Sequence, residues 1–318
     1  MDFDRSDRFY ADFENRFRGP RSLILQRLQT YLPLLAPLQE HTASFSALDL
    51  GCGRGEWLEL LQTRGVTARG VDLNCAQLES CQKRKLSASY NDAITELKSL
   101  AESSETLITA FHLIEHLPNK VLRQLLQEAL RVLIPGGLLI LETPNPDNLS
   151  VGSNSFYLDP THKRPIPSSL LQFLAENAGF EDVHILRLQH DSTLKQKKAI
   201  LLSDVLQGAS PDYAVVAIKS GVPHLNQALE RNAKDYEGLT LQDLCKKFDQ
   251  QQQRLAQQQK AFKAQLGQLE SLQIECQNQI KQEQHNIRMI LESSSWKITK
   301  PLRLLKDLLL RQPKKPIN

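Results

Sequence analysis

Three glycines near residue 50 have the spacing of a loop that binds a ligand through its backbone. Gly51, Gly53 and Gly55 lie in ALDLGCGRG, where an apolar strand runs into a predicted helix. Glycine has no Cβ, so the loop can adopt positive φ angles and let a ligand touch the main chain. Asp72 ends the next predicted strand, GVDLN, where a carboxylate can accept hydrogen bonds from both hydroxyls of a ribose. Together these residues favour a nucleoside-containing ligand over a plain strand-to-helix turn.

The charge around the glycine loop distinguishes between nucleoside ligands. A dinucleotide site would have the spacing G-x-G-x-x-G and would aim a helix N-terminus at a pyrophosphate. Here the spacing is shorter, and Asp49 precedes the first glycine, where it would repel a diphosphate. S-adenosylmethionine carries a sulfonium and an ammonium group, which a carboxylate attracts. The loop therefore predicts S-adenosylmethionine as the cofactor, with Asp92, after the third strand, in reach of the adenine amino group.

Two other segments offer the chemistry that an acceptor hydroxyl needs. Methyl transfer from sulfur is an in-line displacement, and a hydroxyl gains reactivity from a general base or from a metal that lowers its pKa. In FHLIEHLP the fourth strand ends near His112, and Glu115 and His116 follow. His162 lies in FYLDPTHKRP, a proline-rich loop that should return over the same edge of the sheet.

These four residues leave two interpretations open. As a metal site, His112, Glu115, His116 and His162 would suit Zn, Fe or Mn and leave a position for the acceptor oxygen. Without a metal, His116 would be the general base, Glu115 would orient it, and His112 would line the cofactor pocket. A purely structural role is the remaining alternative. The H-x-x-E-H string of inverted zinc peptidases does not apply, because His112 is predicted at a strand end and not in one helix.

The segments that must position these residues have the pattern of a doubly wound, Rossmann-like α/β sheet. Over residues 45–220, apolar runs of strand length alternate with amphipathic runs of helical period. The clearest helix follows Pro118 and is expected to stop at Pro135, Gly136 and Gly137. Residues 1–44 are expected to form a helical segment ahead of the sheet. The predicted strands are SALDLG, ARGVDLN, SASYND, LITAFHL, LLILET, VHILRLQ and DYAVVAIK.

The motif series resembles that of class I S-adenosylmethionine-dependent methyltransferases. The likeness is carried by LDLGCGRG, GVDLN, FHLIEHLP, RVLIPGG and LLILETPNPDN. The resemblance implies a seven-stranded sheet whose last hairpin is antiparallel. It also implies cofactor-binding roles for Asp49, Gly51, Gly53, Gly55, Asp72 and Asp92.

Two narrower resemblances concern the acceptor. FYADFENRFRG, HLIEHLP, ETPNPDN, FYLDPTHKRP and the ending SSSWKITKPLR resemble bacterial methyltransferases encoded with glycosyltransferases for O-antigen and related surface polysaccharides. This likeness implies a sugar hydroxyl or terminal phosphate of such a polysaccharide, or of its lipid-linked precursor, as acceptor. The segment 112–116 is also similar to the metal site of small-RNA 2′-O-methyltransferases and ubiquinone-pathway O-methyltransferases. There E-x-x-E-H and a later histidine hold a divalent ion, whereas His112 replaces the first glutamate here.

Residues 224–295 have the composition of one long helix. Fourteen glutamines fall between residues 250 and 284, and glycine interrupts that run only at Gly267. One series of positions, given at the end of this paragraph, is apolar and recurs every seven residues, whereas the positions three residues after each of its members are mostly glutamine. About half of the seam of a coiled coil would thus be apolar. This pattern favours self-association as a coiled coil through 241–290 over a solvated spacer helix or a disordered polar tract. The apolar positions that recur every seven residues are Leu241, Phe248, Leu255, Phe262, Leu269 and Cys276.

The tail, residues 296–318, is basic and amphipathic. It holds seven Lys or Arg residues against one Asp, whereas the rest of the chain has a net charge of −3. Such a segment can contact an anionic membrane surface or a partner protein such as a glycosyltransferase, and a short helix capping the coiled coil is the alternative. Nucleic-acid binding is not favoured, since it would call for basic stripes in the folded part.

Composition bounds the class of protein. A chain of 318 residues with 41% hydrophobic and 24% charged residues can bury a sizeable core. Five cysteines without a CxxC pair do not suggest a secreted disulfide framework. The N-terminus is too charged for a signal peptide, and no apolar run approaches the ~18 residues of a membrane span. We therefore expect a cytoplasmic protein whose tail can lie at the inner membrane.

These observations predict an S-adenosylmethionine-dependent O-methyltransferase. The expected acceptor is a sugar hydroxyl, or a terminal phosphate, of a glycan or lipid-linked saccharide. O-methylation of a small molecule or of an RNA ribose is a second hypothesis. A third is a non-catalytic scaffold subunit that keeps the fold while its long helix recruits glycosyltransferases.

Overall fold

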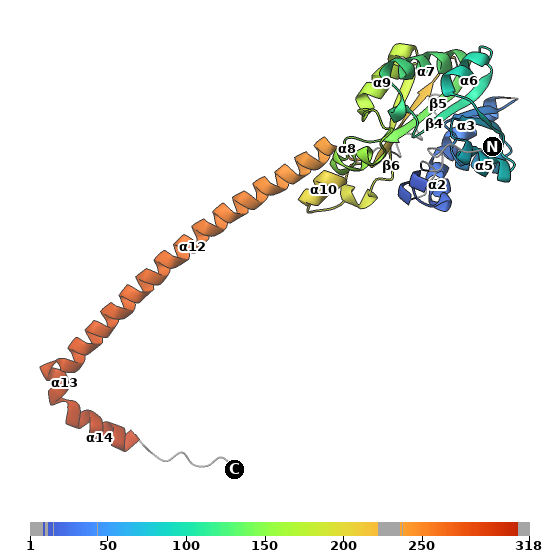
Figure 1. Cartoon of the computed structure of the whole chain (residues 1–318). Helices are drawn as coiled ribbons and strands as arrows, with labels where there is room; N and C mark the ends of the chain where they lie inside the picture. The colour runs from blue at the N-terminus through green and yellow to red at the C-terminus, as the bar shows by residue number, and fades with distance from the viewer. Residues whose placement is uncertain are drawn as a thin grey trace. The chain divides into compact units, whose positions relative to one another are not determined.

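Seven strands pair into one sheet in the order β3-β2-β1-β4-β5-β7-β6 in this computed structural model (Figure 1). The structure describes residues 9, 12–14, 16–42, 44–221, 236 and 238–310. Two compact units make up the chain, residues 1–249 and 250–318. The strands are β1 (Ser46–Leu50), β2 (Thr67–Asp72), β3 (Ala88–Tyr90), β4 (Glu105–Phe111), β5 (Leu133–Pro144), β6 (Asp182–Leu188) and β7 (Asp212–Ile218).

The first five strands run parallel, and β7 inserts between β5 and β6 in the antiparallel direction. The predicted seven-stranded sheet and its antiparallel last hairpin are therefore confirmed. Because β2 and β4 flank β1 on opposite sides, the strand order reverses next to β1. Ligands of open α/β sheets bind at the carboxyl ends of the strands beside such a reversal.

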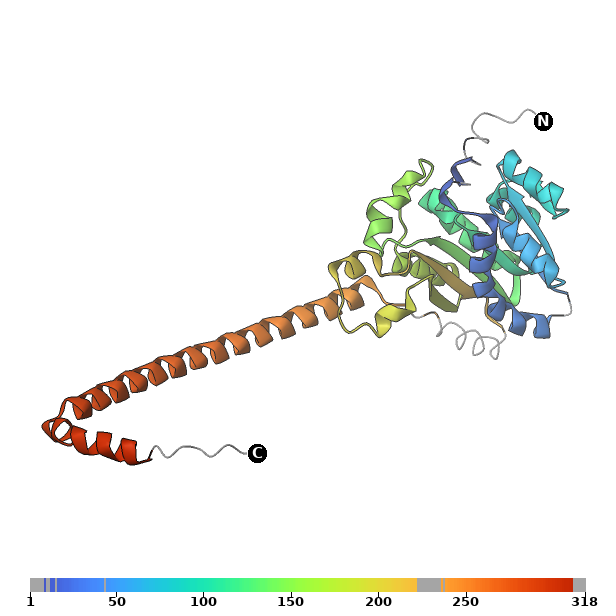
Figure 2. The same ribbon diagram turned by 90° about the horizontal axis from the view of Figure 1, so that it is seen from below.

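Helices cover both faces of the sheet, as the predicted doubly wound fold requires (Figures 1 and 2). Successive strand residues point to opposite faces, so Ile108 packs under α6, α7 and α9 while its neighbour Leu107 packs under α2, α3 and α4. Both residues are fully buried. The helices are α2 (Arg21–Leu28), α3 (Leu32–His41), α4 (Glu56–Thr63), α6 (Ala93–Ser99), α7 (Asn119–Val132) and α9 (Ser168–Ala178).

The predicted helix after Pro118 is α7, and its apolar stripe faces the sheet. Its end differs from the prediction. The helix stops at Val132, and β5 begins at the next residue, so Pro135, Gly136 and Gly137 lie inside the strand. Pairing with distant segments decides this, because Leu133 pairs with Glu105 of β4, and Gly136 and Gly137 exchange backbone hydrogen bonds with residue 219.

Short elements carry the loops over the carboxyl edge of the sheet. The 3-10 helix η2 (Ile114–His116) follows β4, and η3 (Ser155–Leu158) precedes the loop that holds residue 162. The segment predicted as helical at 1–44 contains α2, η1 and α3, while residues 1–8, 10, 11, 15 and 43 lie outside the described residues. The other short elements are η1 (Gln29–Tyr31), α5 (Cys75–Lys83), α8 (Leu149–Ser153), η4 (Ser192–Lys195) and α10 (Leu202–Gln207).

The predicted long helix is α12 (Leu241–Glu292), 52 residues without a break. Residues 222–235 and 237, the start of the segment predicted as helix, lie outside the described residues. Leu244 is fully buried, and with Leu241 and Phe248 it packs against Ile200 and Val205 of the first unit. The first two positions of the predicted seam, Leu241 and Phe248, are thus partly buried within the chain.

Two further helices follow α12, namely α13 (Ser294–Ile298) and α14 (Lys300–Leu310). The Arg303 guanidinium lies over the Trp296 ring, 3.5 Å from its centroid, and joins the two helices. Ile298 and Leu302 are 75% and 70% exposed. The last part of the predicted tail, 311–318, lies outside the described residues. Among the helices that the structure describes, none has the length and apolar character that crossing a membrane demands.

Candidate active site

The loop between β1 and α4 has the backbone conformation that glycine permits. Gly51, Gly53 and Gly55 have φ angles of +70°, +52° and +78°. The Gly51 amide donates to the carbonyl of Val71, and the Gly53 amide donates to Oδ2 of Asp72, each at 2.8 Å. Positive φ strains every residue except glycine. The three glycines therefore hold the loop against the end of β2.

These glycines serve two purposes. Gly51 and Gly53 line a cavity of about 520 Å³, as a cofactor-binding loop should. Gly55 does not line it. A Cβ on Gly55 would lie 2.7 Å from both Sγ of Cys81 and Cδ1 of Leu86. The packing of α4 on α5 explains this third glycine, which departs from the cofactor contact predicted for it.

The cavity lies over the carboxyl ends of β1 to β4, at the reversal of strand order. Asp72 and Asp92, which follow β2 and β3 as predicted, are both in its wall. Asp72 accepts from the Asn74 amide at 2.8 Å as well as from Gly53, although burial raises its pKa. Asp92 caps α6 by accepting from the amides of residues 94 and 95, and its hydrogen bonds with Thr95 lower its pKa. A volume of about 520 Å³ is ample for a nucleoside-sized ligand.

Asp49, predicted to attract the cationic cofactor, lies behind the loop and is absent from the cavity wall. Its side chain is buried, and its Oδ1 accepts from Oγ1 of Thr109 at 2.7 Å. Burial raises the pKa of Asp49 to about 7, against the opposing effects of Thr109 and Arg18. Any attraction that Asp49 exerts on a sulfonium or ammonium group must therefore act across the loop.

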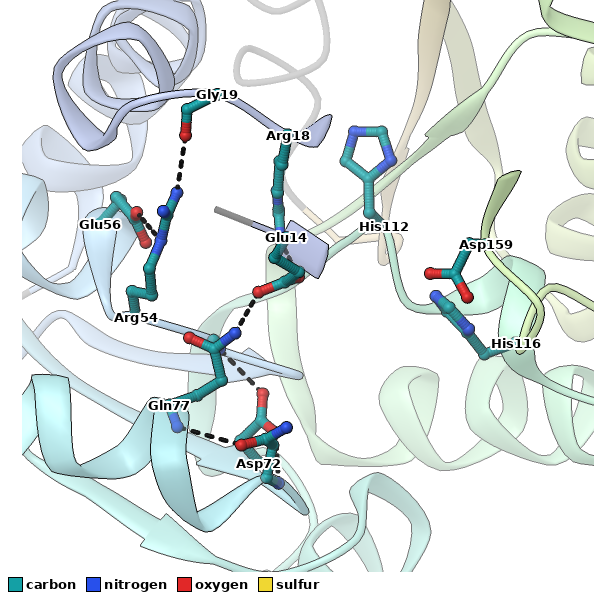
Figure 3. A network of polar contacts seen from close by, with 12 residues as sticks. Glu14, Arg18, Gly19, Arg54, Glu56, Asp72, Gln77, His112, His116 and Asp159 are labelled. Carbon is teal, nitrogen blue, oxygen red and sulfur yellow. Dashed lines mark hydrogen bonds and ion pairs between the residues drawn. The ribbon is translucent and has the colours of Figure 1, made fainter. Parts of the chain in front are cut away.

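The N-terminal segment supplies residues that the sequence reasoning missed. Glu14 and Arg18 form an ion pair at 3.0 Å, and Nε2 of Gln77 donates to Glu14. Figure 3 shows this pair lying between Asp72 and Gln77 on one side and the histidines on the other. Nothing in the sequence pattern of ENRFRG indicates this placement, because the contacts join residues far apart in the chain.

A second cavity, of about 390 Å³, adjoins the first. The two share five wall residues, so a molecule in one would lie next to a molecule in the other. The second cavity is rich in charged side chains and is flanked by the exposed ring of Phe17. Its charged residues include Arg18, Arg27, Glu142, Asp159 and Asp212. The shared wall consists of Glu14, Arg18, Phe111, His112 and His116.

The four predicted catalytic or metal-binding residues separate into two groups. Ligand atoms of Glu115, His116 and His162 all lie within 4.8 Å of one another. His112 instead belongs to a second such group, with Glu142 and Asp212. These two acids come from β5 and the start of β7, far from His112 in sequence, and the sequence reasoning missed both.

His112 is surrounded by carboxylates. Its Nδ1 lies 3.3 Å from Glu115, and its Nε2 lies 3.2 Å from Glu142 and 4.0 Å from Asp212. Burial by itself would lower the pKa of His112, but these hydrogen bonds and charges raise it to about 10. Its φ of +55° turns the residue out of the strand. The imidazolium form of His112, with both nitrogens facing carboxylates, is therefore favoured, and His112 stands apart from the group formed by the other three residues predicted to bind a metal.

His116 has the opposite character. Burial lowers the pKa of His116, and the neighbouring His162 acts in the same direction. Thr161 donates its hydroxyl proton to Asp159 at 2.6 Å, so its Oγ1 accepts from Nδ1 of His116 at 2.8 Å. The neutral ring therefore carries its lone pair on Nε2. A neutral imidazole with a fixed tautomer is suited to accept a proton.

Glu115 and His162 complete the group around His116. Nδ1 of His162 donates to the carbonyl of Phe156 at 2.6 Å, and its Nε2 faces Glu115 and Asp159 at 3.9 Å and 3.8 Å. Glu115 is fully buried, and its Oε2 accepts from Thr143 at 2.9 Å. Hydrogen bonding to His112 lowers the pKa of Glu115 despite its burial. Its Oε1 lies 3.3 Å from Nδ1 of His112 and 3.9 Å from Nε2 of His162.

This donor set fits a divalent metal. A buried carboxylate and two imidazoles whose ligand atoms lie within 4.8 Å of one another are ligands that Zn, Fe or Mn accept. Glu115, His116 and His162 would hold such an ion, whereas His112 would orient Glu115 from outside. Of the four residues predicted to bind a metal, three thus lie together and His112 lies in the second group.

Comparison with known proteins identifies the family. Residues 14–185 match a family model described as a methyltransferase domain. An S-adenosylmethionine-dependent methyltransferase from Archaeoglobus fulgidus of known structure is 32% identical, with a TM-score of 0.59, and the match covers 66% of this chain and all of that one. The chain therefore belongs to the class I S-adenosylmethionine-dependent methyltransferases, and S-adenosylmethionine is its methyl donor.

Curated relatives agree with this class but differ in length. A probable S-adenosylmethionine-dependent methyltransferase from Mycolicibacterium smegmatis is 29% identical over 51% of this chain and 62% of its own length. A ubiquinone biosynthesis O-methyltransferase from Paracidovorax citrulli is 30% identical over 42% of this chain and 56% of its own length. This chain thus spans less than two thirds of either relative.

Proposed function

We propose that this protein transfers a methyl group from S-adenosylmethionine to a hydroxyl oxygen, with His116 as the general base. The observation that carries the proposal is the position of His116 in the wall shared by the two cavities. A cofactor in the larger cavity and an acceptor in the smaller one would meet at this side chain. A non-catalytic scaffold subunit would not need a neutral histidine such as His116 at this position.

The chemistry follows from the hydrogen bonds of His116. The acceptor oxygen attacks the methyl carbon in line with the departing sulfur, and Nε2 of His116 takes the hydroxyl proton. Thr161 and Asp159 hold the ring in the tautomer that this transfer requires. The proton then lies on an imidazolium that the negative charge of Glu115 stabilises. Positioned base catalysis of this kind contributes about 10²–10⁴-fold to a rate.

A metal held by Glu115, His116 and His162 is the second candidate, favoured by the convergence of their ligand atoms within 4.8 Å of one another. Such an ion would act as a Lewis acid that lowers the pKa of the acceptor hydroxyl. In both routes the acceptor oxygen lies at the shared wall, so the reaction class is the same.

For the acceptor we propose a sugar hydroxyl of a glycan or lipid-linked saccharide, as in surface polysaccharide assembly. Carboxylates such as Glu142 and Asp159 can accept hydrogen bonds from vicinal hydroxyls, and Phe17 can pack on the apolar face of a sugar ring. Arg18 and Arg27 also suit a terminal phosphate on such an acceptor. A small phenolic acceptor, like that implied by the name of the ubiquinone-pathway relative, would make less use of these charges.

The tail supports a location at the inner face of a membrane. Leu302 and Leu305 are 70% and 60% exposed on α14, which also carries Lys300 and Arg303. An apolar stripe bordered by cations binds anionic lipid surfaces. Lipid-linked saccharides are found at such surfaces.

Flotation of the full chain with vesicles tests this location. The chain should float with vesicles that contain phosphatidylglycerol and not with vesicles of pure phosphatidylcholine, and Leu302→Asp should release the protein.

The experiment that tests the function measures S-adenosylhomocysteine release with a panel of acceptors. The panel contains lipid-linked oligosaccharides, nucleotide sugars, a catechol and a short RNA. We expect turnover with a saccharide and a product heavier by one CH2 group. Turnover restricted to the catechol or the RNA would refute the sugar assignment. Absence of S-adenosylmethionine binding by calorimetry would refute the enzymatic one, and Asp72→Ala should weaken that binding without unfolding the protein.

A further inference from the structure

We infer that α12 pairs with the α12 of a second copy of this chain in a parallel two-stranded coiled coil, along a seam that begins at Leu255. From Leu255 onward, most of the exposed apolar residues of α12 lie along one stripe, although Leu272, Ile274, Met289 and Leu291 lie off it. Within residues 255–290, eight of the eleven positions with alternating spacings of four and three are apolar. They are Leu255, Phe262, Leu266, Leu269, Cys276, Ile280, Ile287 and Ile290.

This seam differs from the one that the heptad pattern first suggests. Both contain the series 255, 262, 269 and 276, but the partner series lies four residues after each of these positions and not three. It consists of Gln259, Leu266, Gln273 and Ile280 and continues at Ile287. Leu266, Ile280 and Ile287 are 47%, 56% and 54% exposed. Burying such a stripe removes apolar surface from water, which an isolated helix cannot do.

The residue types along the seam specify the occupant. Ile280 and Ile287 occupy a positions, and Leu255 and Leu269 occupy d positions. The other a positions hold Leu266, Gln259 and Gln273, and in a parallel pair each of these glutamines meets its own copy, to which it can hydrogen-bond. Because every seam residue recurs at the same height in an identical helix, a second copy satisfies the whole seam at once.

The flanks of the seam do not oppose this pairing. Between residues 256 and 291 the e and g positions include one lysine, Lys263, and one glutamate, Glu270, and the others are uncharged. In a parallel dimer Lys263 would face Gln258 of the other copy, and Glu270 would face Gln265. No like charges meet across these flanks. Only the Glu283 pair, at a d position, is unfavourable.

The parallel register makes a specific chemical prediction at Cys276. This exposed thiol occupies a d position, so the two copies of Cys276 would lie opposite each other across the dimer axis. Treatment with copper(II)-phenanthroline would remove two protons and pass two electrons to copper, which joins the sulfurs in an interchain disulfide. An antiparallel dimer would separate the two thiols along the axis.

Light scattering of the full chain tests the seam. Leu269 and Ile274 are equally exposed, at 63% and 60%, but only Leu269 lies on the seam. We expect the wild type and Ile274→Lys to have twice the chain mass of 36.1 kDa, and Leu269→Lys and Ile280→Lys to have the single mass. Both seam residues are exposed, so folding of the domain should be retained, which circular dichroism and cofactor binding would verify.

Crosslinking tests the register. The oxidant should convert the wild type to a covalent dimer, and Cys276→Ser should lose that product. Moving the thiol to the outer face in Cys276→Ser/Asn278→Cys should not restore it. A monomeric or trimeric wild type, a dimer that survives Leu269→Lys, or a dimer without crosslinking at Cys276 would each overturn the inference.

Discussion

His112 and His116 lie one on each side of Glu115 yet differ in charge. His112 is held between Glu115, Glu142 and Asp212, and its pKa rises to about 10. His116 contacts a hydroxyl and another histidine, and its pKa falls below the usual value. The comparison shows that the neighbours contributed by distant strands decide which histidine is a fixed cation and which is a base. The two histidine side chains, which are chemically identical, do not decide this difference by themselves.

Removal of His116 should have the largest effect on activity. With the saccharide that the acceptor panel identifies, His116→Ala should lower kcat by about 10²–10⁴-fold, because the acceptor hydroxyl loses its proton acceptor. The affinity for S-adenosylmethionine, measured by calorimetry, should stay close to that of the wild type. A kcat reduced by less than tenfold would show that His116 is not the base.

Removal of His112 should mainly lower stability. His112→Ala leaves Glu115, Glu142 and Asp212 without their cation, and we expect the free energy of unfolding in urea to fall by about 3 kcal/mol. His285→Ala, on the exposed part of α12, is the matched control and should change it by less than about 0.5 kcal/mol. Equal stability of the two variants would show that the carboxylates do not need His112.

The pH dependence of stability should report the same difference. The pKa of His112 is raised in the folded state to about 10 from its ordinary value of 6.5. Its contribution is therefore complete below pH 6.5 and is lost as the pH rises through about 10. Urea unfolding of the wild type should weaken over that interval more than that of His112→Gln. Parallel curves for both proteins would contradict the assignment.

The hydroxyl of Thr161 should matter less than either histidine. Thr161→Val removes the acceptor for Nδ1 of His116 and frees the ring to adopt the other tautomer. The loss of one hydrogen bond, about 1 kcal/mol, should lower kcat about fivefold with little change in KM. Thr161→Ser keeps the hydroxyl and should restore the rate. If both variants are equally slow, packing and not tautomer selection is responsible.

Chelation should have the smallest effect if His116 acts as the base. After dialysis against EDTA, the rate with the same saccharide should equal that of untreated protein. A rate that disappears and returns with added Zn²⁺ or Mn²⁺ would establish the metal route through Glu115, His116 and His162. Mass spectrometry of the untreated protein under native conditions would then show the bound ion.

Much of the fold was predictable because its signals are local. The central strands β1, β4, β5 and β7 are largely apolar runs of the right length, and the conformation of Gly51 and Gly53 follows from the absence of a Cβ. The end of α7 was not predictable, since pairing with β4 draws Leu133 into a strand. The placement of Arg18 and Glu14 beside Asp72 was not predictable either, because nothing in the local pattern of the N-terminal segment encodes it.

The sequence by itself determined the order of strands and helices, the cofactor loop and the identity of the residues that can move a proton. Only the tertiary structure decided how those residues divide the work. Protonation of a histidine depends on charges within a few ångströms, and strands β5 and β7 bring Glu142 and Asp212 to His112 from distant parts of the chain. No spacing along the chain records that proximity.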